Sequence, residues 1–198
     1  MRAIFFDLDG TLLDFERGYA DLLADAIEAA GAKATDDAME TYSDAFYDSF
    51  SACDPDPIRS GFAATDLDAD PGTLADALLT REAEGCRPPD GADATLARLA
   101  EEYPLGVLTN GLREWQLEKL RANGLDEHFD AVVASYEAGA HKPDPAPFRL
   151  AEERLPAGEY AMVGDSDADV EGARDAGWTA HRYGGDGFGD LPGALDRA

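Results

Sequence analysis

The sequence predicts an α/β fold, in which helices flank a parallel β-sheet and a small helical module is inserted early in the chain. Three observations support this prediction. Short apolar runs recur along the chain and end at Gly or polar residues, as buried parallel strands do. Stretches with helical periodicity alternate with the later runs. One long segment, residues 15–87, shows helical periodicity and no strand.

Five apolar runs are expected to form the sheet. They span residues 3–6, 105–108, 131–134, 160–163 and 179–183. Amphipathic stretches that precede or follow them are expected to be helices, over residues 93–102, 114–122, 145–154 and 167–176. In open α/β sheets, ligands bind at the carboxyl ends of the strands. Polar side chains that follow these runs can therefore converge although they are far apart in the sequence.

The inserted segment breaks this alternation. Helices are expected over residues 16–30, 36–50 and 73–84, and a loop over the Pro- and Asp-rich residues 54–71. Aromatic side chains that share one face of the middle helix are expected to pack inside the module: Tyr42, Phe46 and Phe50. The predicted domains are a core of residues 1–14 and 88–198 and a helical module of residues 15–87.

The composition limits the expected partners and location. Forty-two acidic residues face sixteen basic ones, which gives a net charge of −26. Such a field repels nucleic-acid phosphates and anionic membranes. No apolar run approaches a bilayer span, and the run before Asp7 is too short for a secretory signal, so we expect a cytoplasmic monomer or homodimer. The acidic bias resembles that of proteins from salt-loving organisms.

The most specific motif is Asp7-Leu8-Asp9-Gly10-Thr11, directly after the first apolar run. D-x-D alone is uninformative here, because it recurs in so acidic a chain and a solvated acidic turn is the ordinary interpretation. The five-residue motif after a strand is much rarer. A carboxylate at a strand end can act both as a nucleophile toward phosphorus and as a metal ligand. A second carboxylate two residues later can protonate a leaving oxygen and then deprotonate water.

Two further motifs suit an oxyanion. Thr109-Asn110-Gly111 follows the second run, and its hydroxyl and backbone N–H groups could hold a phosphoryl oxygen, although it could equally be an ordinary turn. Lys142 is one of few lysines in the chain, and prolines follow it closely. A lysine beside a carboxylate nucleophile would offset the repulsion between that anion and phosphate. Without the other motifs, a solvated lysine is the simpler interpretation.

Carboxylates also follow the fourth run. Asp165 comes directly after Gly164, and Asp169 lies one helical turn later. Together with Asp7 they suit a Mg²⁺ site, because Mg²⁺ prefers oxygen ligands. Asp167 is expected to cap the helix or to face water.

Taken in this order, the four motifs resemble those of the haloacid dehalogenase superfamily. Residues 7–11 resemble its first motif, Thr109 its second, Lys142 its third, and Asp165 with Asp169 its fourth. The resemblance covers the chain from residue 1 to about residue 183. It implies a Rossmann-like core with strand order 5-4-1-2-3 and an α-helical cap formed by the inserted module. It identifies no motif in the cap, so the particular substrate is not predicted.

The resemblance implies a Mg²⁺-dependent phosphatase that hydrolyses a small-molecule phosphate monoester, such as phosphoglycolate, a sugar phosphate or a nucleoside monophosphate. Asp7 would form an aspartyl-phosphate, and Asp9 would act as acid and then as base. Mg²⁺ would be held by Asp7, the Asp9 backbone carbonyl, Asp165 and Asp169, the last directly or through water. The phosphoryl oxygens would be held by Thr109, Asn110 and Lys142.

Three alternatives stay open. A dehalogenase of the same fold would use the first aspartate without a metal, but Asp9 as an acid/base residue argues against it. Phosphomutases tend to carry Val at the position of Thr11. A phospho-acceptor signalling or binding module also places an aspartate at a strand end beside acidic ligands and a lysine. The helical insert and the presence of Asp9 argue against such a module.

Overall fold

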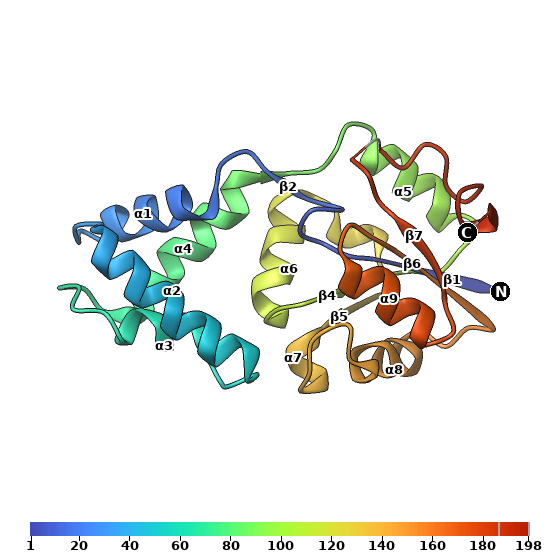
Figure 1. Ribbon diagram of the computed structural model, residues 1–198. Helices are drawn as coiled ribbons and strands as arrows, with labels where there is room; N and C mark the ends of the chain where they lie inside the picture. The colour runs from blue at the N-terminus through green and yellow to red at the C-terminus, as the bar shows by residue number, and fades with distance from the viewer. Residues whose placement is uncertain (186, 198) are drawn as a thin grey trace. The chain divides into compact units, whose positions relative to one another are not determined.

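The computed structural model describes residues 1–185 and 187–197, and the chain divides into two compact units (Figure 1). One unit, called the core here, comprises Met1–Asp14 and Arg87–Ala198, and the other, the helical unit, comprises Phe15–Cys86. The chain leaves the core in β2 (Asp14–Phe15) and returns to it in β3 (Cys86–Arg87), and these two short strands pair with each other. The division differs from the predicted one by a single residue, Arg87.

The core is built on a five-stranded parallel sheet. Its strands are β1 (Arg2–Phe6), β4 (Leu105–Thr109), β5 (Ala131–Ala134), β6 (Glu159–Gly164) and β7 (Thr179–Arg182). Their order is β5-β4-β1-β6-β7. If the five strands are numbered 1 to 5 in chain order, this order is 3-2-1-4-5. It is the predicted order 5-4-1-2-3 read in the opposite direction. The predicted α/β, Rossmann-like sheet is confirmed.

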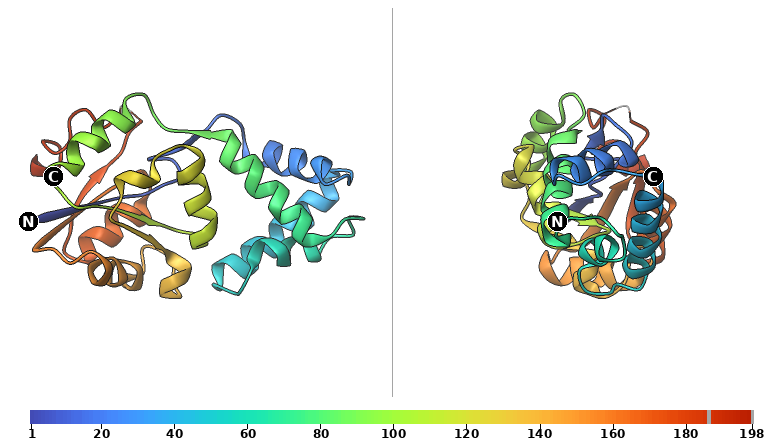
Figure 2. Two further views of the ribbon diagram at one scale, coloured as in Figure 1. Left: turned by 180° about the vertical axis from the view of Figure 1, so that it is seen from behind. Right: turned by 90° about the vertical axis from the view of Figure 1, so that its left-hand side faces the viewer.

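Helices cover both faces of the sheet. They are α5 (Ala92–Ala100), α6 (Arg113–Ala122), α7 (Ser135–Ala138), α8 (Pro145–Arg154) and α9 (Asp167–Asp175), with the 3-10 turns η1 (Asp126–His128) and η2 (Leu195–Arg197). α8 and α9 pack on one face through Phe148 and Val170, which meet Phe5 and Met162 of the sheet. α5 lies on the opposite side (Figures 1 and 2). Burial on both faces explains why the strands are continuous apolar runs.

The register brings the ends of three strands close together. Phe6, at the end of β1, pairs with Val107 of β4 on one side and with Val163 of β6 on the other. β4 ends two residues later, at Thr109, and β6 one residue later, at Gly164. The residues that follow these positions therefore emerge at the same edge of the sheet, at its centre. This is the edge at which the sequence motifs are placed, because Asp7 follows β1 directly.

The helical unit contains four helices, α1 (Tyr19–Ala29), α2 (Asp36–Ser51), α3 (Pro57–Ala63) and α4 (Pro71–Gly85). α1 packs against α4, and α2 against α3. Tyr42 is fully buried, with its ring centroid 4.3 Å from that of Phe62 and 5.8 Å from that of Phe46. The expected packing of Tyr42 inside this unit is confirmed.

The expected loop over residues 54–71 is wrong, because it contains α3. Asp56 is the N-cap of α3, with its carboxylate accepting a hydrogen bond from the N–H of Arg59, and Pro57 occupies the first turn. α4 likewise begins at Pro71, directly after its N-cap Asp70, and so starts two residues earlier than predicted. Asp and Pro are common in loops and also at helix starts, which is why composition alone misled the prediction.

Within residues 1–185 and 187–197, we find no helix that combines the length and apolar character needed to cross a membrane.

Candidate active site

Three carboxylates converge at the centre of the sheet edge. One oxygen each from Asp7, Asp165 and Asp169 lies within 4.8 Å of the others. Asp7 continues the line of β1, since its N–H donates to the carbonyl of Val163 at 2.9 Å. Asp165 follows β6 and is exposed, whereas Asp169 belongs to the first turn of α9 and is fully buried. The structure thus brings together the aspartates that the sequence analysis grouped.

Two glycines make room for this cluster. A Cβ atom on Gly10 would lie 2.8 Å from Asp165 Oδ2. Gly10 also has a φ of +86°, which residues other than glycine rarely adopt. A Cβ atom on Gly164 would lie 2.4 Å from both Cβ and Cγ of Asp169. Both positions therefore require glycine for the carboxylates to approach one another.

Lys142 provides a buried cation for the cluster. Its Nζ donates to Asp7 Oδ1 at 2.8 Å, to Asp169 Oδ1 at 2.5 Å and to the carbonyl of Leu108 at 2.7 Å. The residue is only 5% exposed. Burial disfavours the charged form, but the attraction and hydrogen bonds of Asp7 and Asp169 hold the pKa of Lys142 above its ordinary value. The ammonium therefore stays charged beside Asp7.

Asp7 is itself perturbed by its surroundings. Burial raises the pKa of its carboxyl from 3.8 to about 6, against the lowering effect of Lys142, and the nearby charge of Asp169 raises it further. Its side chain keeps 12% of its surface exposed. A partly accessible carboxyl with a shifted pKa at a strand end is typical of a functional group rather than of a structural ion pair.

The end of β4 borders the cluster. Thr109 is buried, and its Oγ1 accepts a hydrogen bond from Gln116 Nε2 at 3.1 Å. The Asn110 amide pairs with the main chain of Lys142: its Oδ1 accepts from the Lys142 N–H at 2.8 Å, and its Nδ2 donates to the Lys142 carbonyl at 3.3 Å. The Asn110 side chain thus fixes the loop that carries Lys142.

Asp9 is held by two residues that the sequence analysis missed. Lys119 Nζ donates to Asp9 Oδ1 at 2.6 Å and to Oδ2 at 2.7 Å, and Gln116 Nε2 lies 3.2 Å from Oδ2. Lys119 and Gln116 are three residues apart on α6, so they lie on the same face of that helix. The available signal was the scarcity of lysine, combined with two polar side chains on a helix that follows a strand.

Asp165 and Asp167 have different surroundings although they are close in sequence. Asp165 Oδ1 accepts a hydrogen bond from Thr11 Oγ1 at 3.2 Å, which links the first and fourth motifs. Asp167 is exposed and pairs with Arg182. Asp167 therefore lies outside the cluster, as the sequence analysis expected.

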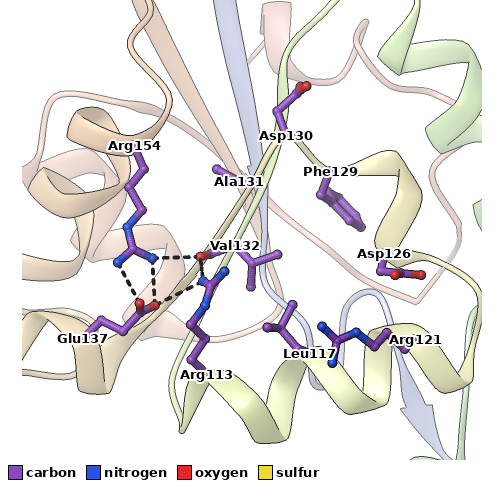
Figure 3. A pocket seen from close by; sticks show the side chains of 10 residues that line it. All are labelled: Arg113, Leu117, Arg121, Asp126, Phe129, Asp130, Ala131, Val132, Glu137 and Arg154. Carbon is purple, nitrogen blue, oxygen red and sulfur yellow. Dashed lines mark hydrogen bonds and ion pairs between the residues drawn. The ribbon is translucent and has the colours of Figure 1, made fainter.

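A hollow of about 550 Å³ lies elsewhere in the core, beside the edge strand β5 (Figure 3). Arg113 and Arg154 converge there on Glu137 and on the carbonyl of Val132. Burial opposes ionisation of Glu137, but the hydrogen bond from Arg154 and its charge hold the pKa of that carboxyl below its usual range. The guanidinium groups of Arg113 and Arg154 therefore bind an edge carbonyl and an acid within this hollow.

The sheet, the aspartates at its strand ends and the buried lysine define an α/β enzyme whose site is built on carboxylates. The chain belongs to the haloacid dehalogenase-like hydrolases, because the model of that family matches residues 1–177. The predictions of this family and of a hydrolase are therefore confirmed.

Relatives agree with this assignment. The chain is 29% identical to pyrophosphatase PpaX of Halalkalibacterium halodurans, over 89% of this chain and 80% of that protein. Among solved structures, a HAD phosphatase from Thermococcus onnurineus is 30% identical, with a TM-score of 0.70 over 97% of this chain and 90% of the other.

Two other solved structures are similar. The magnesium-bound HAD-hydrolase YfnB from Bacillus subtilis is 27% identical, with a TM-score of 0.69 over 90% of this chain and 86% of the other. A 2-haloacid dehalogenase from Pseudomonas syringae is also 27% identical, with a TM-score of 0.71 over 100% of this chain and 99% of the other. Fold similarity therefore includes both phosphatases and dehalogenases, and the site has to decide between them.

Proposed function

We propose that the protein is a Mg²⁺-dependent phosphatase that hydrolyses a small-molecule phosphate monoester through an aspartyl-phosphate on Asp7. One observation carries the proposal: Asp7 contacts the buried ammonium of Lys142 and lies within 4.8 Å of Asp165 and Asp169. Such a site combines a nucleophile, a fixed positive charge and carboxylates that can bind a cation. The phosphatase and the magnesium-bound hydrolase among the similar proteins are consistent with it.

The carboxylates suit Mg²⁺ because they are oxygen donors that converge from different elements. Asp7 and Asp165 would bind the ion directly, together with the backbone carbonyl of Asp9. Both oxygens of Asp169 already accept hydrogen bonds, one from Lys142 and the other from Ser166, so we assign Asp169 a contact through water. When bound, Mg²⁺ supplies positive charge that lets a phosphate dianion approach this acidic site.

The first half of the reaction transfers the phosphoryl group to the protein. A carboxylate oxygen of Asp7 attacks phosphorus, the ester P–O bond breaks, and Asp9 gives its proton to the departing alkoxide. The ammonium of Lys142, fixed by its contact with Asp7, would stabilise the negative charge of the phosphoryl oxygens. Thr109 and the backbone N–H of Asn110 would hold those oxygens at the end of β4.

The second half releases phosphate. Asp9 takes a proton from water, the water oxygen attacks phosphorus, and the bond to Asp7 breaks, which regenerates both carboxyl groups. The helical unit would serve as the cap that selects the ester. Cys53 and Cys86 are thiols rather than a disulfide, which is consistent with a cytoplasmic location. The net charge of −26 is consistent with a salt-rich environment.

The test is phosphate release from a panel of phosphate monoesters, with and without MgCl₂. We expect Mg²⁺-dependent release that excess EDTA stops. Asp7→Asn should lower the rate by about 10³-fold or more, because the nucleophile is lost, while circular dichroism stays that of the wild type. Unchanged release after chelation, or wild-type turnover by Asp7→Asn, would overturn the proposal.

A matched pair of variants distinguishes the loss of a metal ligand from the loss of any acidic charge nearby. Asp165→Asn should raise the Mg²⁺ concentration needed for half-maximal rate by at least about tenfold. Asp167→Asn, two residues away and outside the cluster, should not change it. Release of chloride from 2-chloropropionate with no phosphate released from any ester would instead identify a dehalogenase.

A further inference from the structure

Lys119 is a buried lysine that the proposed mechanism does not use. Its side chain is 3% exposed, whereas that of Asp9 is 35% exposed and open to solvent. The single ammonium contacts both oxygens of Asp9, at 2.6 and 2.7 Å. Burying a lysine carries a large desolvation cost unless a partner offsets it. Lys119 therefore pairs with Asp9, as Lys142 pairs with Asp7 and Asp169.

Gln116 supports the same carboxylate from one turn earlier on α6. Its Nε2 lies 3.2 Å from Asp9 Oδ2, 3.1 Å from Thr109 Oγ1 and 3.1 Å from the carbonyl of Asn110. An amide oxygen in that place would face these acceptors, so the orientation of the amide is fixed. Within the part of the chain that the structure describes, the buried Gln116 Oε1 has no hydrogen-bond partner. Gln116 thus links Asp9 to the end of β4, where Thr109 and Asn110 lie.

We propose that Lys119, assisted by Gln116, is a positioning residue that holds the Asp9 carboxylate for hydrolysis of the aspartyl-phosphate. This inference rests on the proposed function. An ammonium in contact with both oxygens fits the ionised carboxylate, which is the form that accepts a proton from water. In that step the water oxygen bonds to phosphorus, its proton passes to Asp9, and the bond between phosphorus and Asp7 breaks. Lys119 exchanges no proton in this step. Its role is to fix the position of the Asp9 carboxylate.

The first half of the reaction makes a different demand on Asp9. There the carboxyl must carry a proton and face the leaving oxygen, so the oxygen that bears the proton must turn from the Lys119 ammonium. With p-nitrophenyl phosphate the leaving group departs as an anion and needs little protonation. Loss of Lys119 should therefore affect the second half of the reaction alone when this substrate is used.

The experiment compares Lys119→Met with the wild type on p-nitrophenyl phosphate in saturating MgCl₂. Methionine keeps the length of the side chain and removes its charge. Because kcat/KM reports steps up to departure of nitrophenol, it should stay within about threefold, whereas kcat should fall by at least about tenfold. Rapid mixing should show a burst of about one nitrophenol per active site, because the phosphorylated protein accumulates. Lys119→Arg should recover part of kcat.

Two controls make the result specific. Arg121→Met removes an exposed cation from the same helix, and its kinetic constants should match those of the wild type. In an Asp9→Asn background, Lys119→Met should change kcat by less than about twofold, since its partner is already absent. Thermal unfolding of each variant shows whether it is folded under the assay conditions.

The inference is overturned if folded Lys119→Met keeps the wild-type kcat, if kcat and kcat/KM fall together without a burst, or if the two substitutions act independently. A different result, in which the wild type releases no phosphate from any ester, contradicts the proposed function itself. Failure of the inference is thus distinguished from failure of the proposed function.

Discussion

The core and the helical unit bury different kinds of side chain. In the core, the buried polar residues gather mainly around the carboxyl edge of the sheet: Asp7, Thr11, Thr109, Gln116, Lys119, Ser135, Lys142 and Asp169. In the helical unit, Glu82 is the one buried polar residue among those described, and the interior is formed by residues such as Tyr42, Phe62 and Leu78. The comparison separates a region organised around charge from one organised around apolar packing.

This difference has a physical consequence. Buried ion pairs contribute little to stability compared with apolar packing of similar volume, because desolvation offsets most of their attraction. The cluster of Asp7, Lys142 and Asp169 is therefore better explained by chemistry than by folding. The interior of the helical unit is mainly aliphatic and aromatic, so apolar packing accounts for most of it.

The largest difference in activity and stability is expected when one lysine is replaced in each unit. Lys142→Met should lower phosphate release by about 10²-fold or more. It should also destabilise the protein by about 3 kcal/mol, because Asp7 and Asp169 then share a buried site without a cation. Lys33→Met removes an exposed lysine of the helical unit and should change stability by less than about 0.5 kcal/mol.

Thermal unfolding and phosphate-release assays on both lysine variants provide the measurement. Saturating MgCl₂ should restore part of the stability of Lys142→Met, because a bound cation would replace the lost charge. Equal losses of activity in the two variants would remove the distinction between the regions.

Salt should distinguish exposed from buried charge. Between 0.05 and 1 M KCl the screening length falls from more than about 10 Å to about 3 Å, so repulsion among the exposed acids of a chain with net charge −26 weakens. We expect the unfolding midpoint to rise by about 5 °C or more. A midpoint that falls steadily over this range would contradict the proposal that the acidic surface is adapted to a salt-rich environment.

The smallest effect is expected inside the helical unit. Tyr42 is fully buried, and its hydroxyl lies 3.0 Å from that of Tyr19. Tyr42→Phe should cost about 1 kcal/mol, the value of one hydrogen bond, and lower the unfolding midpoint by about 2–4 °C. kcat on p-nitrophenyl phosphate should stay within about twofold. A loss of activity as large as that of Lys142→Met would show that Tyr42 contributes to the reaction. It would contradict the view that the helical unit is organised around apolar packing.

Much of the core could be predicted from the sequence because its signals are local. Residues 7–11 and Gly164-Asp165 follow buried apolar runs, and parallel strands bring their carboxyl ends to one edge. Convergence of Asp7, Asp165 and Asp169 followed from this topology. Lys142 was identified by its rarity, although its contacts with two aspartates depend on where its loop returns to the sheet.

Other features depend on tertiary contacts that no local pattern encodes. Lys119 and Gln116 lie on a helix with few apolar residues, and their burial against Asp9 is set by how α6 packs on the sheet. Asn110 lies at the predicted strand end, but its side chain turns to the Lys142 backbone. In the helical unit, the Asp56-Pro57 start of α3 has the composition of a turn, so the difference lay in capping geometry rather than in composition.

The central claim is that phosphate becomes covalently attached to Asp7. It is tested most directly by acid-quenching the Asp9→Asn variant during reaction with a phosphate monoester and locating the added phosphoryl group by peptide mass spectrometry. We predict the group on the peptide that carries Asp7, and its absence when Asp7→Asn is also introduced. A phosphoryl group on another residue, or an unmodified Asp7 in protein shown to be cleaving the ester, would contradict the account.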